Sequence, residues 1–187
     1  KDSNNDLWVG TFNGGLSLYE GNGKFRNFLD GYSVYCMTEH PEGKLYIGTR
    51  IGLYIMDLET REISAEVFPS FTGMSHIEFF ITTLFTDSQT RLWFGTRNEG
   101  LFMFDHMRLN IRQFKHKLSD ATTISDNNII SICEDTSQNI WIGTANGLNV
   151  FNEVDYGFER VSQRIGIKDY VINGLQSDDH DRIWIST

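Results

Sequence analysis

The 187-residue sequence has few cysteines, few prolines and few basic side chains. Cys36 and Cys133 lie far apart and show no Cys-x-x-Cys spacing, so we expect two buried free thiols in preference to a disulfide or a zinc site. No apolar run approaches about 18 residues, so no part of this segment is expected to insert into a membrane. Sixteen basic against 25 acidic side chains give a net charge of −9, which disfavours nucleic acid as a partner because its binding depends on a cationic surface.

Aromatic residues and glycine, in contrast, are abundant. The chain carries 14 Phe, 7 Tyr and 4 Trp together with 17 Gly, but only 2 Pro. This composition is typical of many short strands joined by tight turns. No stretch shows sustained 3.6-residue periodicity, and residues 119–125 are expected to form a short turn at most. The composition therefore predicts an all-β protein.

A five-residue pattern repeats along the chain: an aliphatic residue, an aromatic residue, an apolar residue, glycine and threonine. Its copies are Leu7–Thr11, Leu45–Thr49, Leu92–Thr96, Ile140–Thr144 and, with serine in place of glycine, Ile183–Thr187. The aromatic positions are separated by 38, 47, 48 and 43 residues, a period in the range of β-propeller blades. The ring is expected to fill the space between neighbouring sheets, and the glycine to let them approach closely. The residues assigned these structural roles are Trp8, Gly10, Tyr46, Gly48, Trp93, Gly95, Trp141, Gly143 and Trp184.

Each repeat is interpreted as four strands. In the third full unit they are predicted at residues 129–134, 140–144, 148–152 and around 158–161. The fold class predicted is a β-propeller made of four-stranded antiparallel blades, with about four blades present. The predicted ranges are a partial blade 1–30, blades 31–68, 79–114 and 128–161, and a partial blade 170–187. The pairs Asn13-Gly14 and Asn146-Gly147 predict type I′ hairpin turns.

An acidic residue usually stands six positions before the repeated aromatic residue. The five positions are Asp2, His40, Asp87, Asp135 and Asp178. The stretches Asp2–Asp6 and Asp178–Asp181 have oxygen ligands as calcium loops do, but Leu7 stands where the first would need glycine. We therefore expect these carboxylates to cap turns by accepting backbone N–H bonds, and no metal site is predicted. The histidines also lack ligand spacing; they are His40, His76, His106, His116 and His180.

Three further motifs follow one another between Phe114 and Thr144. They are Phe-Lys-His-Lys, Ser125-Asp-Asn-Asn-Ile129 and Ile140-Trp-Ile-Gly-Thr144. This run resembles the two-component regulator propeller repeat, and the resemblance extends over essentially the whole chain. The resemblance implies the periplasmic sensor region of a Bacteroidetes hybrid two-component system, in which seven-bladed propellers come in pairs. In that family an immunoglobulin-like domain, a membrane helix and a histidine kinase follow, often with a response regulator.

The length then predicts a piece of such a sensor. At a mean period of 44 residues the chain holds about four and a quarter blades, too few for a seven-bladed ring, and it begins without methionine. The partners implied by the resemblance are the rest of the parent sensor, including a second propeller, and a second copy of the full-length protein in a homodimer. The pattern is broken by Tyr46, His40 and Ser186, which affect packing detail more than the family resemblance.

A ligand is expected at one rim, where the loops between second and third strands meet the loops that lead into the next blade. The predicted ligand-binding residues are Arg50, Arg97, Asn98, Glu99 and His116, with Phe71 as a weaker candidate. Arginine and amide groups bind hydroxyl and carboxylate oxygens, and aromatic rings stack on sugar faces, so an oligosaccharide is the expected ligand.

The sequence gives no positive signal for catalysis. It has no Gly-x-Ser-x-Gly nucleophile elbow and no glycine-rich phosphate loop, so we expect neither an enzyme nor a cofactor in this segment. Two alternatives to a sensor remain open. One is a propeller scaffold for protein contacts in the cell envelope, and the other is a propeller lyase or hydrolase, because propeller enzymes assemble their sites from scattered loops.

Overall fold

The computed structural model describes residues 1–65, 78–162, 164–167 and 171–187, and every regular element in these ranges is a β-strand. The strands form five antiparallel sheets, called units 1 to 5 here. Unit 1 contains β1 (Leu7–Thr11), β2 (Gly15–Gly21) and β3 (Lys24–Phe28). Unit 2 contains β4 (Val34–His40), β5 (Lys44–Thr49), β6 (Leu53–Asp57) and β7 (Ile63–Ala65). Unit 3 contains β8 (Ile81–Thr86), β9 (Leu92–Thr96), β10 (Leu101–Asp105) and β11 (Asn110–Phe114).

Units 4 and 5 complete the set. Unit 4 contains β12 (Ile129–Glu134), β13 (Ile140–Thr144), β14 (Gly147–Asn152) and β15 (Gly157–Arg160), and unit 5 contains β16 (Gly174–Ser177) and β17 (Ile183–Ser186). The four strands of a complete unit are called A to D in chain order. The repeated aromatic residue lies on strand B, so β1 to β3 correspond to strands B to D and β16 to β17 to strands A and B. None of the described segments forms a helix of membrane-spanning length and apolarity.

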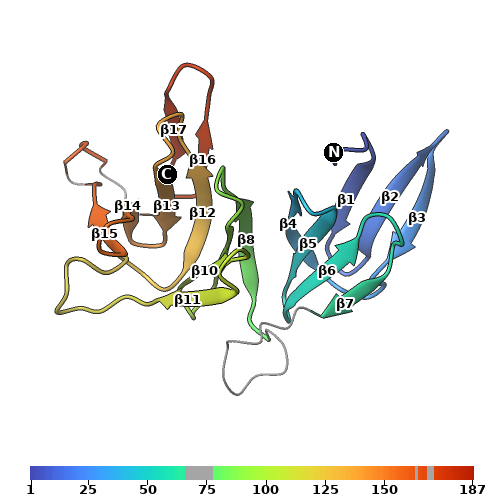
Figure 1. The fold of residues 1–187 in the computed structure, drawn as a ribbon, viewed down its shortest axis with the longest axis horizontal. Helices are drawn as coiled ribbons and strands as arrows, with labels where there is room; N and C mark the ends of the chain where they lie inside the picture. The colour runs from blue at the N-terminus through green and yellow to red at the C-terminus, as the bar shows by residue number, and fades with distance from the viewer. Residues whose placement is uncertain (66–77, 163, 168–170) are drawn as a thin grey trace.

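The units follow one another in chain order: β1–β3 lie at one side of the molecule in Figure 1, and β16–β17 lie beside β12 and β13 of unit 4. The A strands of successive units pack against each other: β4 lies on β8, β8 on β12 and β12 on β16. Sheets packed side by side through their first strands, with the remaining strands placed farther out, are the arrangement of a β-propeller. The predicted fold class, an all-β propeller of four-stranded antiparallel blades, is confirmed.

The strands predicted for unit 4 match the structure closely. β12 and β13 have the predicted bounds, β14 begins one residue earlier, and β15 covers Gly157–Arg160. All five sheets lie inside the predicted blade ranges. Two of these ranges also include residues 66–68 and 170, which lie outside the described residues.

The predicted type I′ turns are wrong. Asn13 has a φ of 62°, but Gly14 is not among the residues with positive φ, and in the Asn146-Gly147 pair only the glycine has one. The cause is the pairing of the repeated threonine at the end of strand B. Thr11 pairs with Gly15, and its hydroxyl donates to the Gly15 carbonyl over 3.0 Å, which leaves a three-residue loop. In unit 4, Thr144 pairs with Gly147, so Ala145 and Asn146 are the two central residues and Gly147 belongs to the strand.

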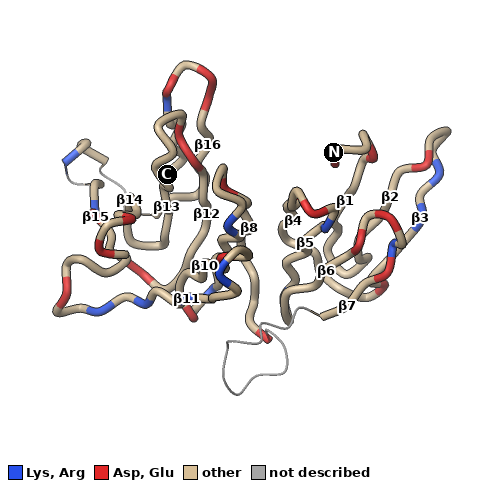
Figure 2. The backbone as a smooth tube through the Cα atoms, viewed as in Figure 1, with Lys and Arg blue, Asp and Glu red and all other residues tan. Residues whose placement is uncertain are grey.

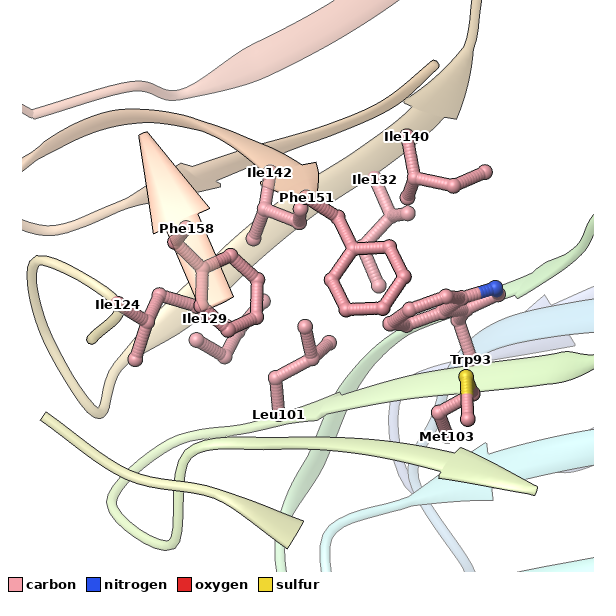
Figure 3. Packing of buried hydrophobic residues seen from close by; sticks show 10 residues of the cluster. All are labelled: Trp93, Leu101, Met103, Ile124, Ile129, Ile132, Ile140, Ile142, Phe151 and Phe158. Carbon is pink, nitrogen blue, oxygen red and sulfur yellow. The ribbon is translucent and has the colours of Figure 1, made fainter. Parts of the chain in front are cut away.

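The repeated glycine and aromatic residue make the contacts between units. A Cβ atom on Gly48 would lie 2.7 Å from Ile81 of unit 3, and one on Gly95 would lie 2.6 Å from Ile129 of unit 4, closer than real Cβ atoms approach. Trp93 is fully buried and packs with Phe151 and several isoleucines of unit 4 (Figure 3). Units 1 to 3 therefore bury the large ring of strand B under the next sheet, whereas Trp141 of unit 4 is half-buried and Trp184 of unit 5 is exposed.

Both cysteines are free thiols, as predicted. Cys133 is buried, Cys36 is half-buried, and burial together with the Asp135 carboxylate raises the pKa of the Cys133 thiol to about 11. A thiol that stays protonated at neutral pH is a poor nucleophile and a poor metal ligand. Cys133 therefore serves as a small apolar residue of the core.

Candidate ligand-binding rim

The B–C loops and the chain entering strand A lie at the same end of each unit. Backbone hydrogen bonds join them: the Arg50 N–H donates to the Ser33 carbonyl over 3.3 Å, and the Arg97 N–H donates to the Phe80 carbonyl over 3.1 Å. Ser33 directly precedes β4, and Phe80 directly precedes β8. The B–C loop and the chain entering strand A are thus bonded together at one end of the unit, and we call the row of these loop ends the B–C rim.

A cavity of about 560 Å³ opens on this rim between units 1 and 2. Its lining contains one of the predicted ligand-binding residues, Arg50, whose side chain is exposed. The full lining is Asn13, Asp30, Gly31, Tyr32, Ser33, Thr49, Arg50 and Ile51. This volume is within the range of about 300–1,000 Å³ typical of small-molecule sites. We call it the Arg50 pocket.

The pocket wall is held by side chains of two units. The Ser33 hydroxyl donates to the Asn13 side-chain oxygen over 2.8 Å and accepts the Asn13 backbone N–H over 3.1 Å. The Tyr32 ring meets Tyr54 edge-to-face at 5.4 Å, which fixes its orientation. Arginine, asparagine, aspartate and tyrosine side chains therefore converge on one hollow, with both charges and an aromatic ring available to a polar ligand.

Arg97 lies on the same rim in unit 3, against an aromatic pair. Its guanidinium carbon is 5.5 Å from the centre of the Phe80 ring, and the Phe80 ring is 4.5 Å from that of Tyr35. Tyr35 is exposed at the start of β4 and belongs to unit 2. A guanidinium stacked on rings next to an exposed tyrosine is a surface suited to a planar or sugar ligand.

Sequence reasoning missed Tyr35 and Phe80. Both stand at the beginning of an A strand, one just after and one just before the first core residue, so they occupy different positions of the repeat. The available signal was an aromatic residue at the entry to strand A, where neighbouring A strands pack together. Phe71 and His76, which also precede β8, lie outside the described residues.

The remaining predicted residues are held within unit 3 and the segment that follows it. Glu99 pairs with Lys115 over 2.7 Å. One ring nitrogen of His116, Nδ1, is 2.8 Å from the Ile124 carbonyl, and the His116 backbone N–H donates to the Asn127 side chain over 2.8 Å. Asn98 is exposed in the B–C loop. The structure thus gives Glu99 and His116 a role in ordering the loop into unit 4, and ligand binding by Asn98, Glu99 and His116 stays a prediction.

At the opposite rim, the repeated carboxylates cap turns, as predicted. Asp87 Oδ1 accepts the backbone N–H groups of Gln89 and Arg91 over 3.0 and 2.8 Å, and Oδ2 accepts the Trp93 indole N–H over 2.7 Å. The same three bonds recur around Asp2, Asp135 and Asp178. Acidic residues gather visibly in one such turn, between β16 and β17 (Figure 2).

These features define a β-propeller of repeated blades, with a pocket on its B–C rim. The family model of the two component regulator propeller matches residues 80–98 and 123–146 of this chain. The resemblance found in the sequence is thereby confirmed. The matched segments are strands A and B of units 3 and 4 with the loops that lead into them and out of strand B.

The chain is also similar to known proteins in sequence and in structure. Histidine kinase P4 of Formosa agariphila is 28% identical over 159 aligned residues, which cover 77% of this chain but 11% of that protein. The extracellular domain assigned to the hybrid two component system BT3049 of B. thetaiotaomicron superposes with a TM-score of 0.82 at 24% identity, over 100% of this chain and 25% of that one. Virginiamycin B lyase of Staphylococcus aureus superposes with a TM-score of 0.70 at 11% identity, over 98% of this chain and 60% of the lyase chain.

These comparisons support different conclusions. The two structural likenesses show the fold alone at such identities. The chain spans about a tenth of the length of the histidine kinase that it matches and a quarter of the extracellular domain. The extracellular domain and the lyase share one architecture, so architecture by itself does not separate a sensor from an enzyme.

Proposed function

We propose that this chain is part of the extracytoplasmic, periplasmic sensor region of a hybrid two-component system and that it binds a glycan-derived ligand. The observation that carries the proposal is the two component regulator propeller match in units 3 and 4. The similarity to a histidine kinase over 77% of this chain supports it. The segment acts by binding, and the catalytic step belongs to a kinase domain elsewhere in the full-length protein.

The Arg50 pocket is the proposed ligand site. The Arg50 guanidinium presents a fork of N–H donors that matches a sugar carboxylate or a pair of hydroxyls, and Asp30 and Asn13 supply acceptors for the remaining hydroxyls. The Tyr32 ring offers a face on which a pyranose ring stacks. The chemistry of the lining therefore favours a short oligosaccharide, with an acidic sugar at Arg50.

Signalling follows from the position of this pocket between two units. A ligand that contacts Asn13 of unit 1 and Arg50 of unit 2 stabilises one arrangement of those units over another. A ligand shifts an equilibrium only by its difference in affinity for the two states. In the proposed full-length homodimer, with a second propeller beside the first, this difference is passed to the relative arrangement of the paired domains.

Calorimetry of the intact protein against a panel of neutral and acidic oligosaccharides tests the proposal. We expect one class of sugar to bind, and Arg50→Ala to weaken it at least about tenfold, the effect of losing roughly 1.4 kcal/mol of binding free energy. Arg108→Ala is the matched control, because Arg108 is an exposed arginine of the C–D turn in unit 3 and pairs with Asp105. Binding that Arg50→Ala leaves unchanged, or no sugar binding at all, contradicts this site.

The sensor assignment has a separate test. If the reading frame that encodes this chain also encodes a secretion signal and a kinase domain, the assignment is supported. If it lacks both, the assignment fails, whatever the pocket binds.

A further inference from the structure

The rim opposite the B–C rim carries the junctions between units 1 and 2, 2 and 3, and 3 and 4, where the A–B turn of one unit meets the C–D turn of the next. Two of these junctions hold an arginine ion pair. Arg61 of unit 2 pairs with Asp6 of unit 1 over 2.6 Å, and Arg91 of unit 3 pairs with Glu153 of unit 4 over 2.8 Å. A positive charge and a carboxylate thus face each other across both junctions.

The junction between units 2 and 3 is built from different side chains. His40 and Glu42 belong to the A–B turn of unit 2, and His106 belongs to the C–D turn of unit 3. One nitrogen or carboxylate oxygen of each lies within 4.8 Å of those of the other two. The two imidazole rings are 4.0 Å apart between centres, with 35° between their planes. Two imidazoles and a carboxylate therefore stand where the neighbouring junctions place an ion pair.

Hydrogen bonds distinguish the two ring nitrogens of His40. Its Nε2 is 3.1 Å from the Thr90 carbonyl, an acceptor, so Nε2–H donates and Nδ1 carries the lone pair. The Glu42 backbone N–H reaches Nδ1 over 3.3 Å, a long bond that a stronger partner displaces. A ring N–H held by a backbone carbonyl is the usual support of a metal-binding histidine.

His106 is half-buried in the C–D turn of unit 3 and offers a ring nitrogen to the same cluster. Its Nε2 lies 3.4 Å from the Tyr46 hydroxyl, which orients the ring toward unit 2.

We propose that His40, Glu42 and His106 bind one Zn²⁺ ion across the junction between units 2 and 3. Two imidazoles and one carboxylate form an established ligand set for zinc, with water at the fourth position, and Glu42 is exposed enough for water to enter. The ion supplies here the positive charge that an arginine supplies at the two neighbouring junctions. It also cross-links units 2 and 3, because its ligands come from both units.

Binding requires a small rearrangement. Zinc–nitrogen distances of about 2.0–2.1 Å place the ligand atoms of a tetrahedral site closer together than 4.8 Å. The lone pairs lie in the planes of the rings, so the His106 ring must rotate out of its tilted contact with His40 for both to face a common ion. His106 is half-buried and Glu42 is exposed, both in turns, and their side chains can make this adjustment while His40 stays held by Thr90.

The test is a calorimetric titration of the intact protein, purified without a histidine tag and stripped with EDTA, using ZnCl₂ alone. We expect one saturable site per chain. Glu42→Gln and His106→Ala should each weaken it at least about tenfold, the smallest effect seen even for partners outside the ligand shell. His40→Ala is avoided because His40 is buried and its loss endangers folding.

Two controls keep the outcome unambiguous. His180→Ala removes an exposed histidine from the turn of unit 5, and Glu59→Gln removes an exposed carboxylate from the C–D turn of unit 2; neither should change the titration. The proposal is overturned if zinc shows no saturable binding, or if both cluster variants bind as the unchanged protein does. It is also overturned if Ca²⁺ or Mg²⁺ binds in place of Zn²⁺, because these cations select oxygen ligands.

Discussion

Units 2 and 3 build the same turn in two ways. In unit 3, Asp87 caps two backbone N–H groups, receives the Trp93 indole N–H and pairs with the Arg91 guanidinium over 2.6 Å, all within the unit. In unit 2, His40 Nδ1 accepts one backbone N–H, and its Nε2–H donates to the Thr90 carbonyl of unit 3. A carboxylate thus makes the turn self-contained, whereas the histidine makes it depend on the adjacent blade.

The contacts between blades differ in the same place. Ser3 donates through its backbone and hydroxyl to Glu39 of the next unit, and Ser88 donates to Glu134 over 2.8 and 2.6 Å. In unit 2 this position is Pro41, which has neither a backbone N–H nor a hydroxyl. At this rim, the junction between units 2 and 3 has instead the bond from His40 to the Thr90 carbonyl and the ring contact between His40 and His106.

The largest expected effect comes from breaking the self-contained turn. Asp87→Ala leaves the buried Arg91 guanidinium and Trp93 indole without their acceptor, and we expect a loss of about 3–5 kcal/mol in the free energy of unfolding. Urea denaturation measures it. Asp57→Ala, at an exposed turn of unit 2, should cost clearly less, because solvent can replace the bonds that the carboxylate accepts there. Equal losses for the two variants would show that the buried pair has no special weight.

Converting unit 2 to the pattern of unit 3 sharpens the comparison. His40→Asp removes the donor to Thr90, while Tyr46→Trp provides an indole N–H for the new carboxylate. We expect the double variant to be more stable than the two single changes predict, by about 1–2 kcal/mol. A double-mutant cycle in urea measures the coupling. Strict additivity would mean that the six-residue spacing alone does not create the bond.

A smaller effect is expected from the contact that unit 2 lacks. Ser88→Ala removes the hydroxyl that donates to Glu134 and retains the backbone bond, so we expect a loss of about 0.5–1.5 kcal/mol. Ser137→Ala, an exposed serine in the A–B turn of unit 4, is the control and should lie within about 0.5 kcal/mol of the unchanged protein. If the two substitutions have the same effect, the Ser88 hydroxyl does not join the blades.

Local pattern explains which parts of this structure were predictable. Strand B of every unit was found because the aromatic residue, the glycine and the threonine recur at fixed spacing, and the turn role of Asp87 followed from its constant distance to Trp93. The type of turn after strand B was not predicted correctly, because the Thr11 hydroxyl competes with the Asn-Gly preference by bonding to the Gly15 carbonyl. Side chain to backbone bonds of this kind are invisible to a two-residue rule.

The sites depend on contacts between units, which a single repeat does not encode. Arg50 was placed on the correct rim because it follows the threonine, but the pocket beside it needs Asn13 from the preceding unit. His40 and His106 are 66 residues apart and meet only because the C–D turn of one blade reaches the A–B turn of the previous one. Their spacing along the chain could not indicate a shared site.

The smallest effect concerns pH, and it separates turns with a carboxylate from the turn with a histidine. The Trp184 indole N–H, with further bonds from the turn and from Arg182, lowers the pKa of Asp178 to about 2, against the opposing effect of burial. A carboxyl group with a depressed pKa stabilises the fold above its ordinary value of about 3.9, and this stabilisation is lost as the pH falls toward 2.

We therefore expect the unfolding midpoint in urea to fall between about pH 4 and pH 2, and Asp178→Asn to make that fall shallower. His40 of unit 2 offers no carboxylate to this window, so His40→Gln should leave the slope between pH 4 and pH 2 unchanged. Carbon-13 NMR of the Asp178 carboxyl measures its titration directly. A titration near the ordinary aspartate value would mean that the indole bond is too weak to favour the charged form, and the turns of units 2 and 5 would then not differ in their response to acid.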